Sequence, residues 1–299
     1  MSSTTNNRVQ DFFSVRFRRL LSGAKDGVPP WLQIIADGET GGLFLPNEAP
    51  WIVHRDFATL VGGVRALLMQ ALHPGSLAGV MQHSRYEQDA LGRLSGTIRW
   101  LTVTTFGSHA AVAAEASRVN RLHDRVSGSY SAGDGAERDY RAADQDLLLW
   151  VHLAFNESFL AAHNTFSSAS VDADDYVRLW ARSVEPLGLQ RVPVDFAGLQ
   201  AGLASFDGVL RADADTKQVV RFIRRVRLPW YARPMYRLLW LAAVDSLQPK
   251  YLELLGLKQP GRWVRPVTKG GLRFLRWVIG PESPIEDGAL RRLKRLGVI

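Results

Sequence analysis

Residues 57–74 read FATLVGGVRALLMQALHP, and this stretch decides the fold class. Its apolar side chains recur three or four positions apart, for example at Leu60, Val64 and Leu67, which is the spacing of one buried helix face. The helix is expected to end at His73, because Pro74 lacks a backbone donor and disfavours helical geometry in the residue before it. The same spacing dominates most of the chain, so the sequence predicts an all-α protein.

Similar signals mark the other elements. Ser108 is a good N-cap for a helix that ends near Gly128, and Asp144–Phe166 reads as one long apolar helix. The Gly- and Ser-rich segment Ser127–Glu137 is expected to be a loop, and only Gly42–Leu45 looks extended. Additional helices are expected around Leu77–Met81, after Gly92, and at Asp172–Glu185, Phe196–Leu210, Thr216–Val226, Pro234–Ser246 and Leu272–Val278.

Neither a repeat nor a long linker divides the 299 residues. We therefore expect a single, mostly helical domain, globin-like in its packing style, over residues 51–257. A helical or irregular lead-in is expected at 1–50, and an irregular, basic extension at 258–299.

The composition excludes several classes of protein. Hydrophobic residues make up 46% and charged residues 22%, which is ordinary for a globular protein and excludes a disordered or collagen-like chain. The chain has no cysteine, so it holds no disulfide, thiolate zinc site, iron–sulfur cluster or thiolate-bound haem. Any redox metal must therefore be held by nitrogen or oxygen. No long apolar run or ordinary secretion signal is present, and we expect a cytoplasmic protein, peripheral to a membrane at most.

The net charge of +8 is concentrated at the C-terminal end, where ten Lys or Arg residues face three acids from Lys258 onward. This segment is expected to be either an ordinary solvated face or a contact with an anionic membrane surface. It therefore also supports an alternative function, a non-catalytic helical protein that binds a lipid or a partner. Nucleic acid is not an expected partner, because no docking motif accompanies the charge. Five basic residues of the segment recur three or four positions apart, with aromatic and apolar residues between them: Arg262, Arg265, Lys269, Arg273 and Arg276, interleaved with Trp263, Phe274, Trp277 and Ile279.

Histidine is the informative residue type, because the sequence lacks a nucleophile elbow, a phosphate-binding loop and a zinc-protease helix. His123 continues an apolar row formed by Val112, Ala116 and Val119. A histidine on a buried stripe must find a partner, since an unmade polar contact costs about 1–3 kcal/mol. His123 is therefore either a core residue bonded to a backbone carbonyl or an axial ligand of haem iron.

Two further groups of residues each have a structural and a functional interpretation. His152, Asn156 and His163 share one face of the long helix, as either a pocket lining or a network between helices. Arg93 and Thr97 stand one turn apart. The arginine is either a solvated charge or a group that polarises bound oxygen or peroxide, with the threonine as a second hydrogen-bonding group.

The order and spacing of seven motifs between Phe57 and Leu257 resemble a known family. This family is the catalytic domain shared by latex-clearing protein (rubber oxygenase) and the fungal oxygenase MpaB. The motifs are Gly63–Pro74, Gly92-Arg93 with Thr97, Phe106-Gly107, Val119–Val126, Trp150-Val151-His152, Arg233-Pro234-Met235-Tyr236 and Leu254-Leu255-Gly256-Leu257.

The resemblance implies an all-helical fold that holds non-covalent haem b, with His123 as the proximal iron ligand. It implies Arg93 and Thr97 as the distal catalytic pair. This chain has Gly96 where the rubber oxygenase has a lysine that can occupy the sixth iron position, so a more open distal face is expected. The motif residues Arg65, His73 and His152 are further expected cofactor contacts.

The rubber enzyme's catalytic glutamate has no clear counterpart in this sequence. The resemblance therefore does not imply that this protein cleaves polyisoprene. The resulting expectation is a haem b-dependent oxygenase that uses dioxygen or peroxide on a small apolar or amphipathic molecule.

Overall fold

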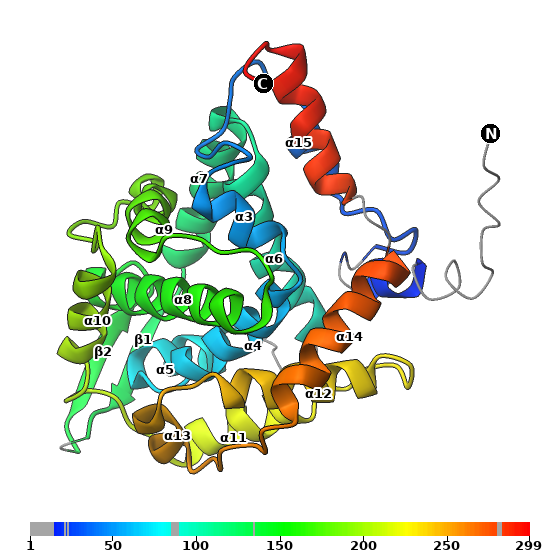
Figure 1. Cartoon of the computed structure of the whole chain (residues 1–299). Helices are drawn as coiled ribbons and strands as arrows, with labels where there is room; N and C mark the ends of the chain where they lie inside the picture. Colours follow the sequence, from blue (N-terminus) through cyan, green and yellow to red (C-terminus); the bar gives the residue numbers. More distant parts are fainter. Residues whose placement is uncertain (1–14, 21, 23, 85–89, 134, 280–282) are drawn as a thin grey trace.

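The computed structural model describes residues 15–20, 22, 24–84, 90–133, 135–279 and 283–299. Helices dominate these residues, which confirms the all-α fold class (Figure 1). The helices are α2 (Leu32–Ala36), α3 (Ala49–Arg55), α4 (Ala58–Gln70), α5 (Pro74–His83), α6 (Ala90–Phe106), α7 (His109–His123), α8 (Gln145–Phe166), α9 (Ala173–Trp180), α10 (Phe196–Ser205), α11 (Ala214–Arg224), α12 (Arg233–Asp245), α13 (Pro249–Leu255), α14 (Val264–Ile279) and α15 (Pro284–Arg295).

The expected break at His73 is confirmed, and a new helix follows it directly. Pro74 occupies the first position of α5, and Nδ1 of His73 accepts the backbone N–H of Ser76 at 3.3 Å. The predicted cap at Ser108 is also confirmed, because its hydroxyl accepts the N–H of Ala111. Each cap satisfies a backbone donor that the first turn of a helix leaves free.

The segment expected to be a loop before α8 is instead a β-hairpin. Strands β1 (Ser127–Ser131) and β2 (Glu137–Arg141) pair antiparallel, with Gly128 opposite Tyr140. Helix α7 consequently ends at His123, earlier than predicted. The extended stretch expected at Gly42–Leu45 forms bends rather than a strand.

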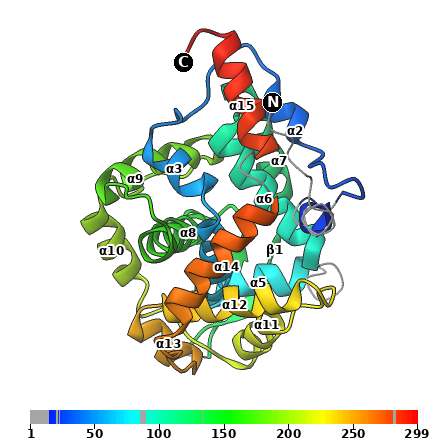
Figure 2. The same ribbon diagram turned by 45° about the vertical axis from the view of Figure 1, so that its right-hand side comes forward.

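The C-terminal extension is helical over residues 264–279 and 284–295, so the expectation of an irregular segment is wrong there, apart from the helix expected at Leu272–Val278, which is confirmed as part of α14. Pro266 lies in the first turn of α14, where its missing N–H removes no helical hydrogen bond. Helices α13 and α15 were not predicted at all. In Figure 2, α14 crosses the front of the molecule, close to α12.

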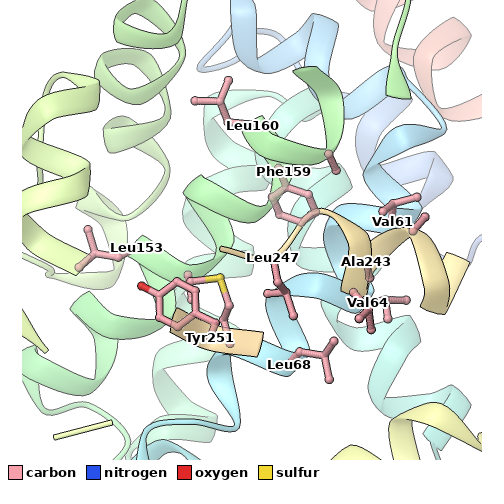
Figure 3. Packing of buried hydrophobic residues seen from close by; sticks show 14 of the residues in the cluster. Val61, Val64, Leu68, Leu153, Phe159, Leu160, Ala243, Leu247 and Tyr251 are labelled. Carbon is pink, nitrogen blue, oxygen red and sulfur yellow. The ribbon is translucent and has the colours of Figure 1, made fainter. Parts of the chain in front are cut away.

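The centre of the fold is the contact between α4 and α8. A Cβ on Gly62 would lie 2.6 Å from Cδ1 of Phe159 and 3.1 Å from the carbonyl oxygen of Ser158, so glycine lets the two helices approach closely. Figure 3 shows Val61, Val64 and Leu68 of α4 in the surrounding cluster, with Phe159 of α8 and Ala243 of α12.

Candidate functional site

A cavity of about 400 Å³ lies beside this core, between α5, α6, α7 and α8. Its volume falls within the range of small-molecule sites, about 300–1,000 Å³. The wall is mostly apolar and includes Val80, Leu101, Val119, Leu122, Val126, Leu148, Val151, Phe155, Val184, Leu187 and Leu189. Such a wall favours an apolar ligand, because burying apolar surface contributes about 25 cal/mol per Å².

His123, the last residue of α7, lines this cavity. Its Nδ1 atom is buried and makes no hydrogen bond to any described residue. Burial lowers the pKa of His123 below its ordinary value, although the nearby carboxylate of Asp124 opposes the shift. The imidazole is therefore neutral at pH 7 and retains a nitrogen lone pair, which is the form that binds a metal.

His152, from the middle of α8, faces the same cavity and is only 4% exposed. Burial lowers its pKa to about 4, and its Nε2 atom has no partner within the described part of the chain. Ser183 also lines the cavity, and its buried hydroxyl is likewise unpaired there. Because buried polar groups are normally hydrogen-bonded, these atoms indicate a wall that is completed by a ligand or by water.

The expected distal pair lies on α6. Thr97 lines the cavity, while Arg93 stands one turn earlier on the same helix. The side chain of Arg93 falls outside the described part of the structure, so its role stays a prediction. Gly96 also lines the cavity, and a Cβ added there would meet no described atom within 4 Å. The wall is therefore open at the position where the rubber oxygenase carries a lysine.

Arg65 and His73 do not line the cavity, and both are engaged elsewhere. The guanidinium of Arg65 is fully buried and bonds the Glu157 carboxylate, the Ser158 hydroxyl and the carbonyl of Ser246. His73 caps α5, and burial lowers its pKa to about 4. The structure thus brings Thr97, His123 and His152 to one cavity and gives Arg65 and His73 contacts within the protein.

The remaining members of the α8 polar face are buried in the core. Both side-chain polar atoms of Asn156, and both ring nitrogens of His163, are buried and unpaired among the described residues. His54 lies near His163, and its Nε2 is 3.2 Å from the hydroxyl of Tyr176. Of the residues on this face, His152 is therefore the one that lines the cavity.

The residues of the cavity wall that sequence reasoning missed include Arg118, Trp180 and Ser183. Arg118 lies outside the apolar row of Val112, Ala116 and Val119 that singles out His123. Its guanidinium donates to the buried carboxylate of Glu115 at 2.6 Å, and Arg99 donates to the same carboxylate at 2.8 Å. Two arginines on one carboxylate leave a net positive charge next to the cavity. Trp180 ends α9 and Ser183 lies in the short helical turn that follows it, and no local pattern in the sequence indicates that they line the cavity.

Residues 51–280 match the family described as ER-bound oxygenase mpaB/B'/Rubber oxygenase, catalytic domain. The chain belongs to this family. The match confirms the resemblance inferred from the motifs and assigns an oxygenase catalytic domain, and so an oxidoreductase, to most of the chain. It also extends beyond Leu257, to the end of α14. Comparison with curated proteins and with solved structures gives no match.

Two further observations concern metal clusters and membrane spans in the part of the chain that the structure describes. In the described ranges, no three His, Asp or Glu side chains gather into a metal-binding cluster. Among the same residues, no helix combines the length and hydropathy needed to span a bilayer.

Proposed function

We propose that this protein is a haem b-dependent oxygenase that holds iron through His123 and acts on a small apolar or amphipathic molecule. One observation carries the proposal. His123 is a neutral imidazole with a buried, unpaired nitrogen, and it stands in the wall of a large apolar cavity. Membership of an oxygenase family supports the reaction class.

The residues of the cavity suit haem b in three respects. His123 offers the neutral nitrogen that a ferric or ferrous iron requires. The apolar residues of α7 and α8 offer surface to the macrocycle, and Arg118 offers a cation to a carboxylate of the cofactor or the substrate. Haem b, when bound, supplies an iron that reacts with dioxygen or peroxide.

The chain's own side chains have separate tasks under this proposal. The apolar wall excludes water and selects an apolar substrate. Thr97 orients the oxidant by hydrogen bonding, and Arg93 on the same helix stabilises developing negative charge. His152 faces the cavity as a neutral hydrogen-bonding group, because its pKa of about 4 leaves it uncharged at pH 7. These roles assign no substrate beyond its apolar character.

The test is an absorption spectrum of the purified chain after reconstitution with haemin. We expect a Soret band that His123→Ala abolishes and that the exposed-site control His109→Ala retains. Arg93→Ala and Thr97→Ala should keep the Soret band but lose oxygen consumption with an active substrate. Absence of a Soret band in the unaltered chain would overturn haem binding. Loss of the band in His152→Ala but not in His123→Ala would overturn the assignment of the ligand.

Gly96 provides a second, gain-of-contact test of the same cavity. Because a side chain at position 96 enters open space, Gly96→Lys should bring an amine into the cavity. The reconstituted variant should show a shifted Soret band and slower binding of added imidazole. Gly270→Lys is the matched control, since Gly270 also has open space at its Cβ but does not line the cavity. Equal spectra for the two variants would mean that haem lies elsewhere.

A further inference from the structure

Helix α14 has an exposed apolar stripe that its packing does not explain. One face is buried and includes Val264, Leu272 and Leu275. A second face places residues 267, 270, 274 and 277 close to one line along the helix, at about 100° per residue, and Trp263 directly precedes the first helical residue. The large side chains of this stripe are strongly exposed: Trp263 by 55%, Val267 by 48%, Phe274 by 53% and Trp277 by 49%.

A basic stripe runs beside the aromatic one. Lys269, Arg273 and Arg276 share the next sector of α14, Arg262 lies in the turn just before the helix, and all four side chains are exposed. Within the described part of the chain, none of the four makes an ion pair or a side-chain hydrogen bond. The segment from Lys258 to Ile279 contains six Lys or Arg residues and no Asp or Glu. An amphipathic helix with apolar and basic sectors side by side is the arrangement that binds in the plane of a membrane interface.

The connection between α11 and α12 adds a second basic feature to this region. A hollow there is lined by five arginines and by no acidic residue: Arg224, Arg225, Arg227, Arg233 and Arg237. The same connection carries Trp230, whose side chain is 71% exposed. From Thr216 to Val244 the sequence has seven Lys or Arg residues and no Asp or Glu.

The hollow and the stripe belong to one part of the molecule. Leu228 and Ala232 of the α11–α12 connection share a buried cluster with Leu275 and Val278 of α14. These contacts involve the C-terminal half of α14, since Leu275 and Val278 lie near its end. Phe274, Trp277 and the arginines of the hollow thus lie close in sequence to the residues of the same packed contact.

We propose that α14 and the α11–α12 connection form a docking surface for a bilayer of anionic phospholipid. Trp263, Phe274 and Trp277 enter the interfacial region, where aromatic rings are favoured. The flanking basic stripe lies over the lipid phosphates, and the arginine hollow takes a phosphate group through charge-assisted hydrogen bonds. This inference is independent of haem and of the proposed reaction.

The charge and the apolar character of this surface favour an anionic bilayer over a second copy of the chain or a nucleic acid. A second copy of the chain would bring two basic, acid-free surfaces together, and their like charges repel. A nucleic acid would satisfy the basic residues but would leave the aromatic stripe beside them without a matching apolar surface. An anionic bilayer satisfies both sectors of α14 at once.

The test is co-sedimentation of the full chain with phosphatidylcholine vesicles, with and without an equal share of phosphatidylglycerol. We expect binding to the mixed vesicles only, weakened by added salt because the attraction is electrostatic. Replacing Lys269, Arg273 and Arg276 by Gln should lower the partition coefficient about a hundredfold, since each basic residue near the surface contributes roughly fivefold. The triple variant Trp263→Ser, Phe274→Ser, Trp277→Ser should lower it at least tenfold. The matched controls Arg141→Gln and Val194→Ser, at exposed sites on other elements, should leave it unchanged.

Several results would overturn the proposal. Equal binding to neutral and mixed vesicles would do so, as would an equal loss of binding in the control variants. Tight binding to duplex DNA that the aromatic variant does not alter, without binding to mixed vesicles, would make the surface a nucleic-acid site. If light scattering shows a dimer that the aromatic variant dissociates, and no vesicle binding is seen, the surface is an interface between copies of the chain. Thermal unfolding at an unchanged temperature shows that each variant is folded.

Discussion

The buried histidines give the fold a specific sensitivity to acid. Burial lowers the pKa of His152 and of His73 to about 4, and burial together with His163 lowers that of His54 to about 3. The unfolded chain has a histidine pKa near 6.5, so between pH 6.5 and 4 the unfolded state binds more protons than the folded state. Stability therefore falls as the pH drops through this window.

We expect each of these histidines to lower the free energy of unfolding by about 3 kcal/mol between pH 7 and pH 4, because a pKa difference of one unit corresponds to about 1.4 kcal/mol. The measurement is the free energy of unfolding of the haem-free chain in urea, at steps from pH 7 to pH 4. His152→Leu should reduce the fall in the free energy of unfolding between pH 7 and pH 4 by the contribution of one histidine. His109→Leu, at an exposed site, should leave that fall unchanged. Identical slopes in the unaltered chain and in His152→Leu would contradict the assignment.

Three of the six residues that the sequence predicts for the site, Thr97, His123 and His152, line the cavity. His123 and His152 were accessible to sequence reasoning because each sits in an apolar helical row, and both line the cavity. Arg65 and His73 lie in a motif shared with the family but contact other parts of the protein. A motif does not reveal which side of its helix faces a cavity, because that depends on the partners that pack around it.

At the scale of elements, two adjacent glycines in α4 have opposite roles. A Cβ on Gly62 would meet the Cα of Phe159 at 3.0 Å and the carbonyl of Ser158 at 3.1 Å, whereas one on Gly63 would meet nothing within 4 Å. Backbone cannot yield as a flexible side chain can, so Gly62→Ala should force α4 away from α8. Overpacking of this kind costs about 1–3 kcal/mol.

Gly63→Ala is the matched control, because it adds the same methyl group one residue along the same helix. It should stabilise the protein by up to about 1 kcal/mol, the helix preference of alanine over glycine. Urea unfolding of the two variants measures the contrast. Equal stabilities for Gly62→Ala and Gly63→Ala would show that the α4–α8 contact is looser than the structure has it.

The elements that sequence patterns predicted are those with a regular apolar period. Helices α4 and α8 have such a period and were expected close to their observed bounds. The strands read SGSYS and ERDYR, and neither alternates apolar with polar residues. The hairpin forms next to the cavity, where Tyr140 is 3% exposed and bonds Gln82. Its stability thus comes from tertiary contacts that no local pattern records.

At the scale of the whole molecule, the two ends of the chain depend on each other. Arg292 of α15 is fully buried, and its guanidinium donates to the carbonyl of Phe106 at 2.9 Å and to the carbonyl of Ile35 in α2. Helix α2 has five residues, too few to be stable alone. Ile35 shares a second apolar cluster with Ala289 and Leu293 of α15. The last helix therefore holds an early segment of the chain in place.

Arg292→Met tests this dependence, because it keeps the apolar stem of the side chain but removes the donors from two buried carbonyls. Each unsatisfied acceptor costs about 1–3 kcal/mol, so we expect a loss of about 3 kcal/mol in urea unfolding. Arg291→Met, at the exposed neighbour, should stay within about 0.5 kcal/mol of the unaltered chain. Since α15 does not line the cavity, the Soret band expected under the proposed haem binding should be the same for folded Arg292→Met and for the unaltered chain. A spectral change of the kind expected for Gly96→Lys would instead mean that the chain ends help to shape the cavity.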